Sequence, residues 1–182
     1  MSGFVIWFTG LPAAGKSTVA GLVGRELEQR GLLVDPLDGD VVRTHLSKGL
    51  GFSKEDRDTN IERIGWVAAR LARAGVVVVV SAISPYDDAR RKARSLVEEH
   101  APFVLVHVAT SLAECERRDP KGLYAKAHAG QLSGFTGVDD PYEPPLDAEF
   151  RLETEGRTPE QSAALVLDRL RELGLIAEEA AA

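Results

Sequence analysis

The stretch Gly10-Leu11-Pro12-Ala13-Ala14-Gly15-Lys16-Ser17-Thr18 decides the fold of this chain. It follows the short apolar run 4–8 and precedes a segment whose apolar residues recur at helical spacing as far as Leu27. The pattern Gly-x-x-x-x-Gly-Lys-Ser between a strand and a helix is typical of a loop that binds nucleotide phosphates. We therefore predict that residues 10–18 bind a nucleoside triphosphate.

Each part of this loop has a physical reason. Gly10 and Gly15 allow backbone turns that a side chain blocks, so that successive N–H groups point into one concavity. The N-terminus of the following helix adds unpaired donors and the positive end of its dipole. Lys16 is expected to reach the β- and γ-phosphates, and the Ser17 hydroxyl to bind Mg²⁺. The alternative, a plain glycine turn with a solvated lysine, is disfavoured by agreement along all nine residues.

Composition and charge narrow the classes of function. The chain has 182 residues, 44% of them hydrophobic, which suits one domain over residues 1–182. The net charge of −6 argues against general nucleic-acid binding, so an anionic substrate requires a local basic pocket. The run 76–80 is too short to cross a membrane. The single cysteine, Cys115, fits a reducing cytoplasm.

Apolar runs and helical periodicities alternate along the chain. Buried strands are predicted at 4–9, from 32 towards 38, at 76–80, 103–108 and 150–152, and helices at 16–30, 41–46, 56–74, around 90–94, from 111, and at 159–173. This order predicts an α/β fold of the three-layer P-loop NTPase type, a parallel sheet with helices on both faces. Residues 119–145 lack periodicity and are predicted to form a lid without elements of its own. Residues 177–182 are expected to fray.

Two carboxylates follow the second predicted strand. Asp38 and Asp40 lie at a strand end, where ligands bind in folds of this kind. One is expected to orient or deprotonate an acceptor hydroxyl and the other to hold metal-bound water. The alternative is a simple turn, because Asp-Gly-Asp is favourable turn chemistry.

A basic and aromatic group follows these carboxylates. Arg57 and Asn60 share a face of the predicted helix 56–74, and arginine suits bidentate binding of phosphate-like oxygens. Arg43 precedes them, and Phe52 lies in a loop where it is available to stack on a base. The alternatives are ordinary surface charge for the arginines and a small satellite core for Phe52.

The later candidates are Ser84 and two residues of the lid. Ser84 ends a strand before Pro85, so its hydroxyl either faces the pocket or caps the next helix. Lys121 is one of several lid cations that suit closure over a triphosphate, although a flexible surface loop has the same composition. Phe135 is the lid's one phenylalanine.

With these residues assembled, the chain resembles the adenylylsulfate kinase (APS kinase) family over roughly residues 4–150. The phosphate loop alone indicates only a nucleotide, whereas the later motifs are more selective and occur in the family's order. They are LDGDVVR at 37–43, LGFSKEDR at 50–57, NIERIG at 60–65, ISPY at 83–86, RDPKGLY at 118–124 and GFTGVDDPY at 134–142. The departures are Val41, where the family often has Asn, and Ala82, where it often has Phe.

The resemblance implies phosphorylation by ATP of the 3′-hydroxyl of adenosine 5′-phosphosulfate (APS), giving the 3′-phosphorylated product PAPS in sulfate assimilation. Lys16, Asp38 and Ser84 are the implied catalytic residues, although direct in-line transfer needs no phosphoserine intermediate. The implied substrate-binding residues are Asp38, Asp40, Arg43, Phe52, Arg57, Asn60, Ile83, Ser84, Lys121 and Phe135, with Phe52 and Phe135 enclosing the adenine.

The family is usually dimeric, which implies a homodimer here. Two other functions stay open at this point: a different small-molecule hydroxyl kinase of the same fold, and a nucleotide-binding regulatory module. A neutral acceptor has no need of two arginines beside a carboxylate, which favours the anionic substrate APS.

Overall fold

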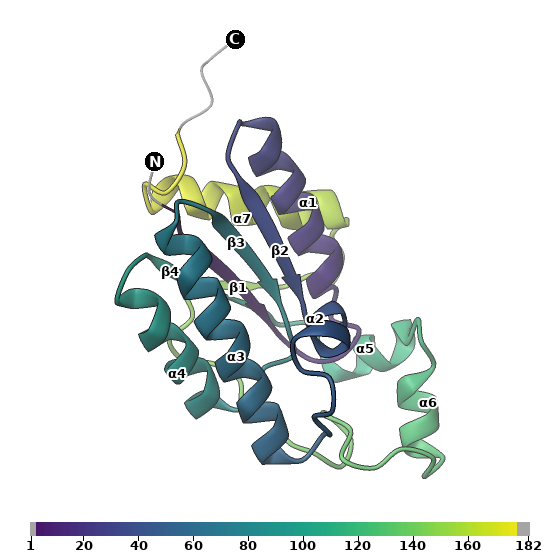
Figure 1. The fold of residues 1–182 in the computed structure, drawn as a ribbon. Helices are drawn as coiled ribbons and strands as arrows, with labels where there is room; N and C mark the ends of the chain where they lie inside the picture. The colour runs from purple at the N-terminus through teal and green to yellow at the C-terminus, as the bar shows by residue number, and fades with distance from the viewer. Residues whose placement is uncertain (1–2, 178–182) are drawn as a thin grey trace.

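A computed structural model describes residues 3–177 of the chain. Its centre is a parallel sheet of five strands in the order β2-β3-β1-β4-β5 (Figure 1). Their bounds are β1 Val5–Thr9, β2 Val34–Asp38, β3 Val77–Ser81, β4 Phe103–Val108 and β5 Phe150–Leu152. The strand order reverses beside β1, and ligands in open α/β sheets bind at such a switch point.

Helices cover both faces of this sheet. They are α1 Lys16–Gln29, α2 Gly39–His45, α3 Lys54–Arg73, α4 Asp87–Glu98, α5 Leu112–Arg118, α6 Leu123–His128 and α7 Pro159–Glu172. In Figure 1, α3 and α4 lie in front of the strands and α1 and α7 lie behind them. The predicted α/β class with a parallel sheet and two helical layers is therefore confirmed.

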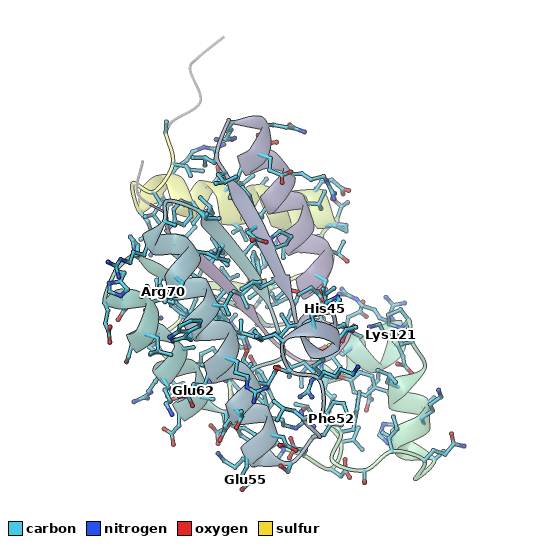
Figure 2. All side chains as sticks on the ribbon, in the orientation of Figure 1. His45, Phe52, Glu55, Glu62, Arg70 and Lys121 are labelled. Atoms are coloured by element: carbon cyan, nitrogen blue, oxygen red, sulfur yellow. The ribbon has the colours of Figure 1, made fainter. Side chains whose placement is uncertain are left out.

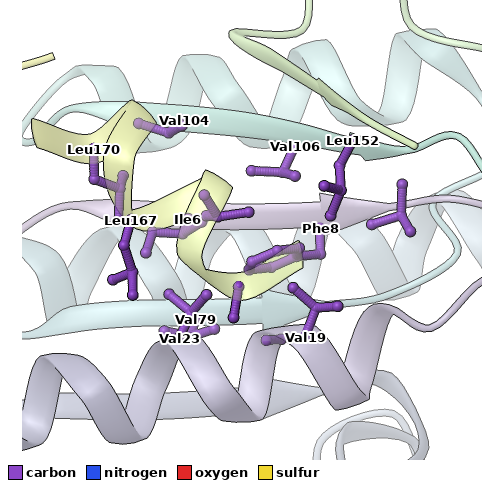
Figure 3. Packing of buried hydrophobic residues seen from close by; sticks show 14 of the residues in the cluster. Ile6, Phe8, Val19, Val23, Val79, Val104, Val106, Leu152, Leu167 and Leu170 are labelled. Atoms are coloured by element: carbon purple, nitrogen blue, oxygen red, sulfur yellow. The ribbon is translucent and has the colours of Figure 1, made fainter. Parts of the chain in front are cut away.

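The core is divided by the sheet into two hydrophobic clusters. Alternate residues of β1 point to opposite faces, so Ile6 packs with α1 and α7 while Trp7 packs with α3 and α4. Figure 3 shows the first cluster, in which Val19, Val23, Leu167 and Leu170 of the two helices close over Ile6 and Phe8 of the strand. Strands buried on both faces explain the continuous apolar runs in the sequence.

Caps fix the starts of the helices that lead into the cleft. The Ser53 hydroxyl accepts from the Asp56 amide at 3.1 Å, so α3 begins at Lys54, two residues before the predicted start. The Asp56 carboxylate bonds the Gly51 amide at 2.8 Å instead of returning to Ser53. Only one of the two bonds of a capping box is therefore present at the start of α3.

One expectation and one alternative are wrong. The lid at 119–145 contains α6, whose first turn is held by the Asp119 carboxylate; six residues are too few to show a period. Ser84 does not cap a helix, because α4 begins at Asp87 with Tyr86 as its N-cap residue. Most of the predicted fraying segment, residues 178–182, lies outside the described residues.

Within residues 3–177, no helix combines the length and apolar character needed to span a bilayer.

Candidate active site

A cavity of about 980 Å³ opens at the carboxyl ends of the strands. The phosphate loop forms its middle. Because β1 is the middle strand, the lining residues that follow β2, among them Arg43 and Phe52, and those that follow β5, Thr154 and Pro159, lie on opposite sides of this loop. This is where the strand order reverses, as expected for a ligand site in a doubly wound sheet.

The cavity brings together most of the predicted site residues. From the phosphate loop it is lined by Pro12, Ala13, Gly15, Lys16, Ser17 and Thr18, and from the rest of the chain by Asp38, Asp40, Arg43, Phe52, Arg57, Asn60, Ile83, Ser84, Lys121 and Phe135. Gly10, Leu11 and Ala14 lie behind this surface, where their carbonyls accept bonds from Lys16 and Thr110. These three residues shape the loop through the backbone.

Glycine is required at two positions of the loop. A Cβ on Gly10 would lie 2.6 Å from the carbonyl oxygen of Val108, which leaves no room for a side chain. Gly15 has φ +100° and is the N-cap residue of α1, a conformation that favours glycine. The loop therefore passes close to β4 and then turns into the helix with its amides exposed to the cleft.

Lys16 is buried beneath the loop. Its ammonium donates to the carbonyls of Gly10 at 3.0 Å and Leu11 at 2.8 Å. Burial lowers the pKa of Lys16 to about 8, against the opposing influence of Cys115, Asp38 and Asp40. An anion bound in the loop would offer this amine a stronger partner than the two carbonyls.

Asp38 connects β2 to the loop. Its carboxylate accepts from the Ser17 hydroxyl at 2.6 Å, the Ser81 hydroxyl at 2.8 Å and the Asp40 amide at 3.0 Å. Partial burial raises the pKa of Asp38, but the bonds from Ser17, Ser81 and the backbone outweigh it and leave the pKa below its ordinary value. The site therefore holds a carboxylate anion next to two hydroxyl groups.

Oxygen atoms of this kind fit Mg²⁺, which prefers carboxylate, hydroxyl and phosphate oxygens. Ser17 and Asp38 are the protein residues in position to bind it beside the phosphates. Within residues 3–177 there is no cluster of three or more histidine, cysteine or acidic side chains suited to a metal.

Asp40 and Lys121 join α2 to the lid. Their side chains form an ion pair, and both remain largely exposed. Figure 2 shows Lys121 and Phe52 near α2 on the same side of the molecule. Because Lys121 lies near the start of the lid, this ion pair links the lid to α2 beside the cleft.

Two guanidinium groups converge on the Phe52 ring. Arg43 lies 4.5 Å and Arg57 5.6 Å from its centroid. Phe52 is 64% exposed, so the predicted alternative of a satellite core is wrong for this residue. Burial first, and then the charge of Arg57, lower the pKa of Arg43. In a chain of net charge −6, this local gathering of positive charge prepares the end of the cleft for an anion.

Arg57 is also bound to the lid. It is 7% exposed, which rules out the surface-charge alternative. Its guanidinium donates to the Phe52 carbonyl at 2.8 Å, the Thr136 hydroxyl at 2.9 Å and the Gly134 carbonyl. Arginine has five N–H donors, so one hydrogen on each terminal nitrogen is left for a ligand.

Asn60 supplies an unpaired polar atom beside these arginines. It is 5% exposed and lines the cleft. Its Oδ1 finds no hydrogen-bond partner among the described residues. A buried amide oxygen without a partner is costly, and a hydroxyl donor of a bound ligand would satisfy it.

Ser84 is held in an unusual conformation. Its φ of +46° is rare for a residue with a side chain. Trp7 donates its indole hydrogen to the Ser84 hydroxyl at 3.0 Å, and Arg90 donates to the Ser84 carbonyl at 2.6 Å. Ser84 is 1% exposed and lines the cleft, so it shapes the wall of the cleft.

Three further contributions were not predicted from the sequence. Ser81 bonds Asp38, Arg90 holds the Ser84 backbone, and Tyr124 contacts both the phosphate loop and Phe135. Tyr124 belongs to a motif and Ser81 lies close to one, but the partner of Ser81 is 43 residues away and that of Tyr124 is 112 residues away. No sequence pattern indicated that Thr154 and Pro159 line the cleft.

Comparison with known proteins gives a consistent picture. The family model for adenylylsulphate kinase matches residues 2–153. An adenylyl-sulfate kinase of Rippkaea orientalis is 52% identical over 179 residues, which cover 98% of this chain and 97% of that protein. A probable bifunctional SAT/APS kinase of Sorangium cellulosum is 51% identical, with this chain spanning 31% of its length.

A solved structure is also similar. The APS kinase of Mycobacterium tuberculosis, in complex with AMPPNP and APS, has a TM-score of 0.90 and 45% identity to this chain. The match covers 93% of this chain and 98% of that one.

Proposed function

The chain belongs to the adenylylsulfate kinase family, and we propose that its cleft aligns ATP on the phosphate loop with APS at the Phe52 end. The activity is that of the family: transfer of the γ-phosphate of ATP to APS, giving PAPS and ADP. The shape and charge of the cleft support a distinct role in this reaction for each group of residues that lines it.

ATP binds with its phosphates in the loop 10–18. The exposed amides at the start of α1 and the ammonium of Lys16 neutralise the anionic chain of phosphates. On binding, Lys16 exchanges its bonds to Gly10 and Leu11 for bonds to phosphate oxygens. The nucleoside of ATP lies at the end formed by Thr154, Arg157 and Pro159, because Arg43 and Arg57 at the opposite end are assigned to the anionic acceptor.

Mg²⁺ is proposed as the cofactor, held by the Ser17 hydroxyl, with Asp38 binding directly or through water. When bound, it supplies charge neutralisation for the transferring phosphate. The bond between Ser17 and Asp38 keeps both oxygens oriented before the ligand arrives.

APS binds at the other end of the cleft. Arg43 and Arg57 pair with its phosphosulfate, since guanidinium groups match the geometry of such oxygens. Its adenine lies between Phe52 and Phe135, and the Asn60 amide oxygen accepts from a hydroxyl of the ribose. The Ile83 and Ser84 segment forms the wall against which the acceptor packs.

Transfer is direct and in line. The 3′-oxygen of APS forms a bond to the γ-phosphorus as the bond from that phosphorus to the β,γ-bridging oxygen breaks, the hydroxyl proton passes to an oxygen of the transferred phosphate, and ADP leaves. Asp38 orients the 3′-hydroxyl, because a carboxylate with a lowered pKa is a weak base. Ser84 takes no phosphate, because its buried hydroxyl is occupied by Trp7.

The lid closes over both substrates. Lys121 adds positive charge above the phosphates and Asp40 keeps it in place. Closure excludes water, which would otherwise accept the phosphate.

The assembly and location of the protein are part of the proposal. The family's usual homodimer is proposed here, and light scattering of the purified chain tests it. The single cysteine supports a cytoplasmic location.

The observation that carries the proposal is the convergence of Arg43 and Arg57 on Phe52 at one end of a phosphate-binding cleft. ADP release measured with ATP alone, with APS, and with an uncharged acceptor such as a sugar tests it. We expect release only with APS. Equal release with a sugar would favour a different hydroxyl kinase, and release without any acceptor would favour a nucleotide hydrolase or switch.

A further inference from the structure

Tyr124 of α6 contacts both halves of the cleft. Its side chain is 2% exposed. The phenol donates to the carbonyl of Pro12 at 3.0 Å, and the ring packs edge-on against Phe135, with centroids 5.0 Å apart and planes at 87°. One side chain therefore touches the tip of the phosphate loop and the proposed adenine platform.

The start of α6 anchors this tyrosine. The Asp119 carboxylate accepts from the amides of Leu123 at 2.8 Å, Tyr124 at 3.1 Å and Ala125 at 3.1 Å. Three charge-assisted bonds to one turn fix the direction in which the Tyr124 side chain leaves the helix. The ring is thus a rigid connection.

The bond to Pro12 orients part of the phosphate loop. In a planar trans peptide the carbonyl and the N–H point to opposite sides. Fixing the Pro12 carbonyl towards Tyr124 therefore turns the Ala13 N–H the other way, and Ala13 lines the cleft with φ +61°. A carbonyl held in this way keeps the neighbouring amide oriented for a phosphate.

The contact with Phe135 orients the proposed acceptor end of the cleft. The residues on either side of Phe135 are held by Arg57, through the Gly134 carbonyl and the Thr136 hydroxyl. Tyr124 contacts the Phe135 ring itself. The position of Phe135 therefore depends on the same tyrosine that orients the phosphate loop.

We propose that Tyr124 is a positioning residue that couples ATP binding to acceptor binding, by joining the Pro12 carbonyl to the Phe135 ring. The inference rests on the proposed function, in which Phe135 packs against the adenine of APS. In this proposal a single side chain links the binding of one substrate to the affinity for the other.

The test measures the dissociation constant of AMPPNP by calorimetry, without APS and with saturating APS, for the wild type and Tyr124→Phe. Tyr124→Phe keeps the ring and removes only the hydroxyl. We expect it to weaken AMPPNP binding without APS by about three- to tenfold, as for loss of one buried hydrogen bond. We also expect APS to strengthen AMPPNP binding in the wild type and to lose most of this effect in the variant.

Tyr86→Phe is the matched control, because Tyr86 is also buried and its phenol bonds Asp140 at 2.9 Å, away from the phosphate loop. Its AMPPNP affinity should stay within about twofold of the wild type. Tyr124→Leu, which also removes the ring edge, should in addition raise the KM for APS. Melting temperatures identify any variant that fails to fold.

Three results would overturn the inference: unchanged AMPPNP affinity and APS effect in Tyr124→Phe, equal losses in Tyr86→Phe, or no effect of APS on AMPPNP in the wild type. If the proposed function itself were wrong, the measurements would give a different result. The wild type would then bind AMPPNP but release no ADP in response to APS, while the measurement without APS would still report on the bond to Pro12.

Discussion

The Ser17 hydroxyl and the Asp38 carboxylate lie 2.6 Å apart, although 21 residues separate them in the chain. Ser17 belongs to the first turn of α1 and Asp38 ends β2, so the parallel sheet brings them together. Ser81 at the end of β3 completes a triangle, at 3.0 Å from Ser17 and 2.8 Å from Asp38. The ends of two strands and one helix thus supply the oxygen atoms beside the phosphate loop.

Replacing Asp38 by asparagine tests this group. Asp38→Asn keeps the size of the side chain but removes the charge that binds metal or orients the acceptor. We expect kcat to fall by about 100-fold or more, with AMPPNP binding largely retained. Steady-state kinetics and calorimetry measure the two effects. Asp35→Asn, on the same strand but outside the cleft, should be close to the wild type; a near-normal kcat in Asp38→Asn would refute the assignment.

The pH dependence of ATP binding is set by Lys16. Burial lowers its pKa to about 8, so the free protein loses this charge as the pH rises above that value. Phosphate favours the protonated amine, so ATP binding should take up protons near this pH. We expect kcat/KM for ATP to fall as the pH rises from about 7 to about 9.5.

Calorimetry in two buffers with different ionisation enthalpies measures this proton uptake directly. A binding enthalpy that is the same in both buffers near pH 8, together with a flat kcat/KM, would show that Lys16 does not change its protonation on binding.

Removing the Lys16 amine should abolish most turnover. In Lys16→Ala we expect kcat to fall by roughly 100- to 1,000-fold, because the γ-phosphate loses its fixed positive partner during transfer. Lys126→Ala is the control, since this lid lysine is exposed and does not line the cleft. Turnover near the wild-type rate in Lys16→Ala would contradict the role given to this amine.

Arg57 should discriminate between the two substrates. Arg57→Ala removes a charged donor from the acceptor end and releases the lid on both sides of Phe135. We expect the KM for APS to rise by about 10- to 100-fold and the KM for ATP to change less than about threefold.

Arg70→Ala provides the comparison on the same helix, because Arg70 lies over the exposed ring of Trp66 and outside the cleft. Equal losses for ATP and APS in Arg57→Ala would show that Arg57 does not belong to a separate acceptor site.

Much of the fold was predictable from the sequence, because its signals are local. The strands 103–108 and 150–152 were predicted with the bounds that the structure shows, and the helix after the phosphate loop was predicted to begin at residue 16, as it does. Continuous apolar runs identify strands covered on both faces. By contrast, α6 was missed, because its six residues are stabilised by the Asp119 side chain more than by a periodic pattern.

The candidate site was predictable as a set of residues and less so as a set of contacts. The motifs placed Arg57, Asn60 and Phe135 at one cleft, and the structure brings them together there. The contacts themselves join distant parts of the chain. Arg57 bonds a lid residue 77 positions away, and Tyr124 bonds Pro12, 112 positions away. Such contacts form only when the folded sheet has brought the loops together, so no local sequence pattern predicts them.

A structure of the protein with AMPPNP and APS tests the central claim most directly. We predict the phosphosulfate within hydrogen-bond distance of Arg43 and Arg57, the adenine between Phe52 and Phe135, and the 3′-hydroxyl facing the γ-phosphate beside Asp38. Clear density for APS at another place, with both guanidinium groups facing solvent, would contradict the proposed acceptor site and leave only the ATP end of the cleft assigned.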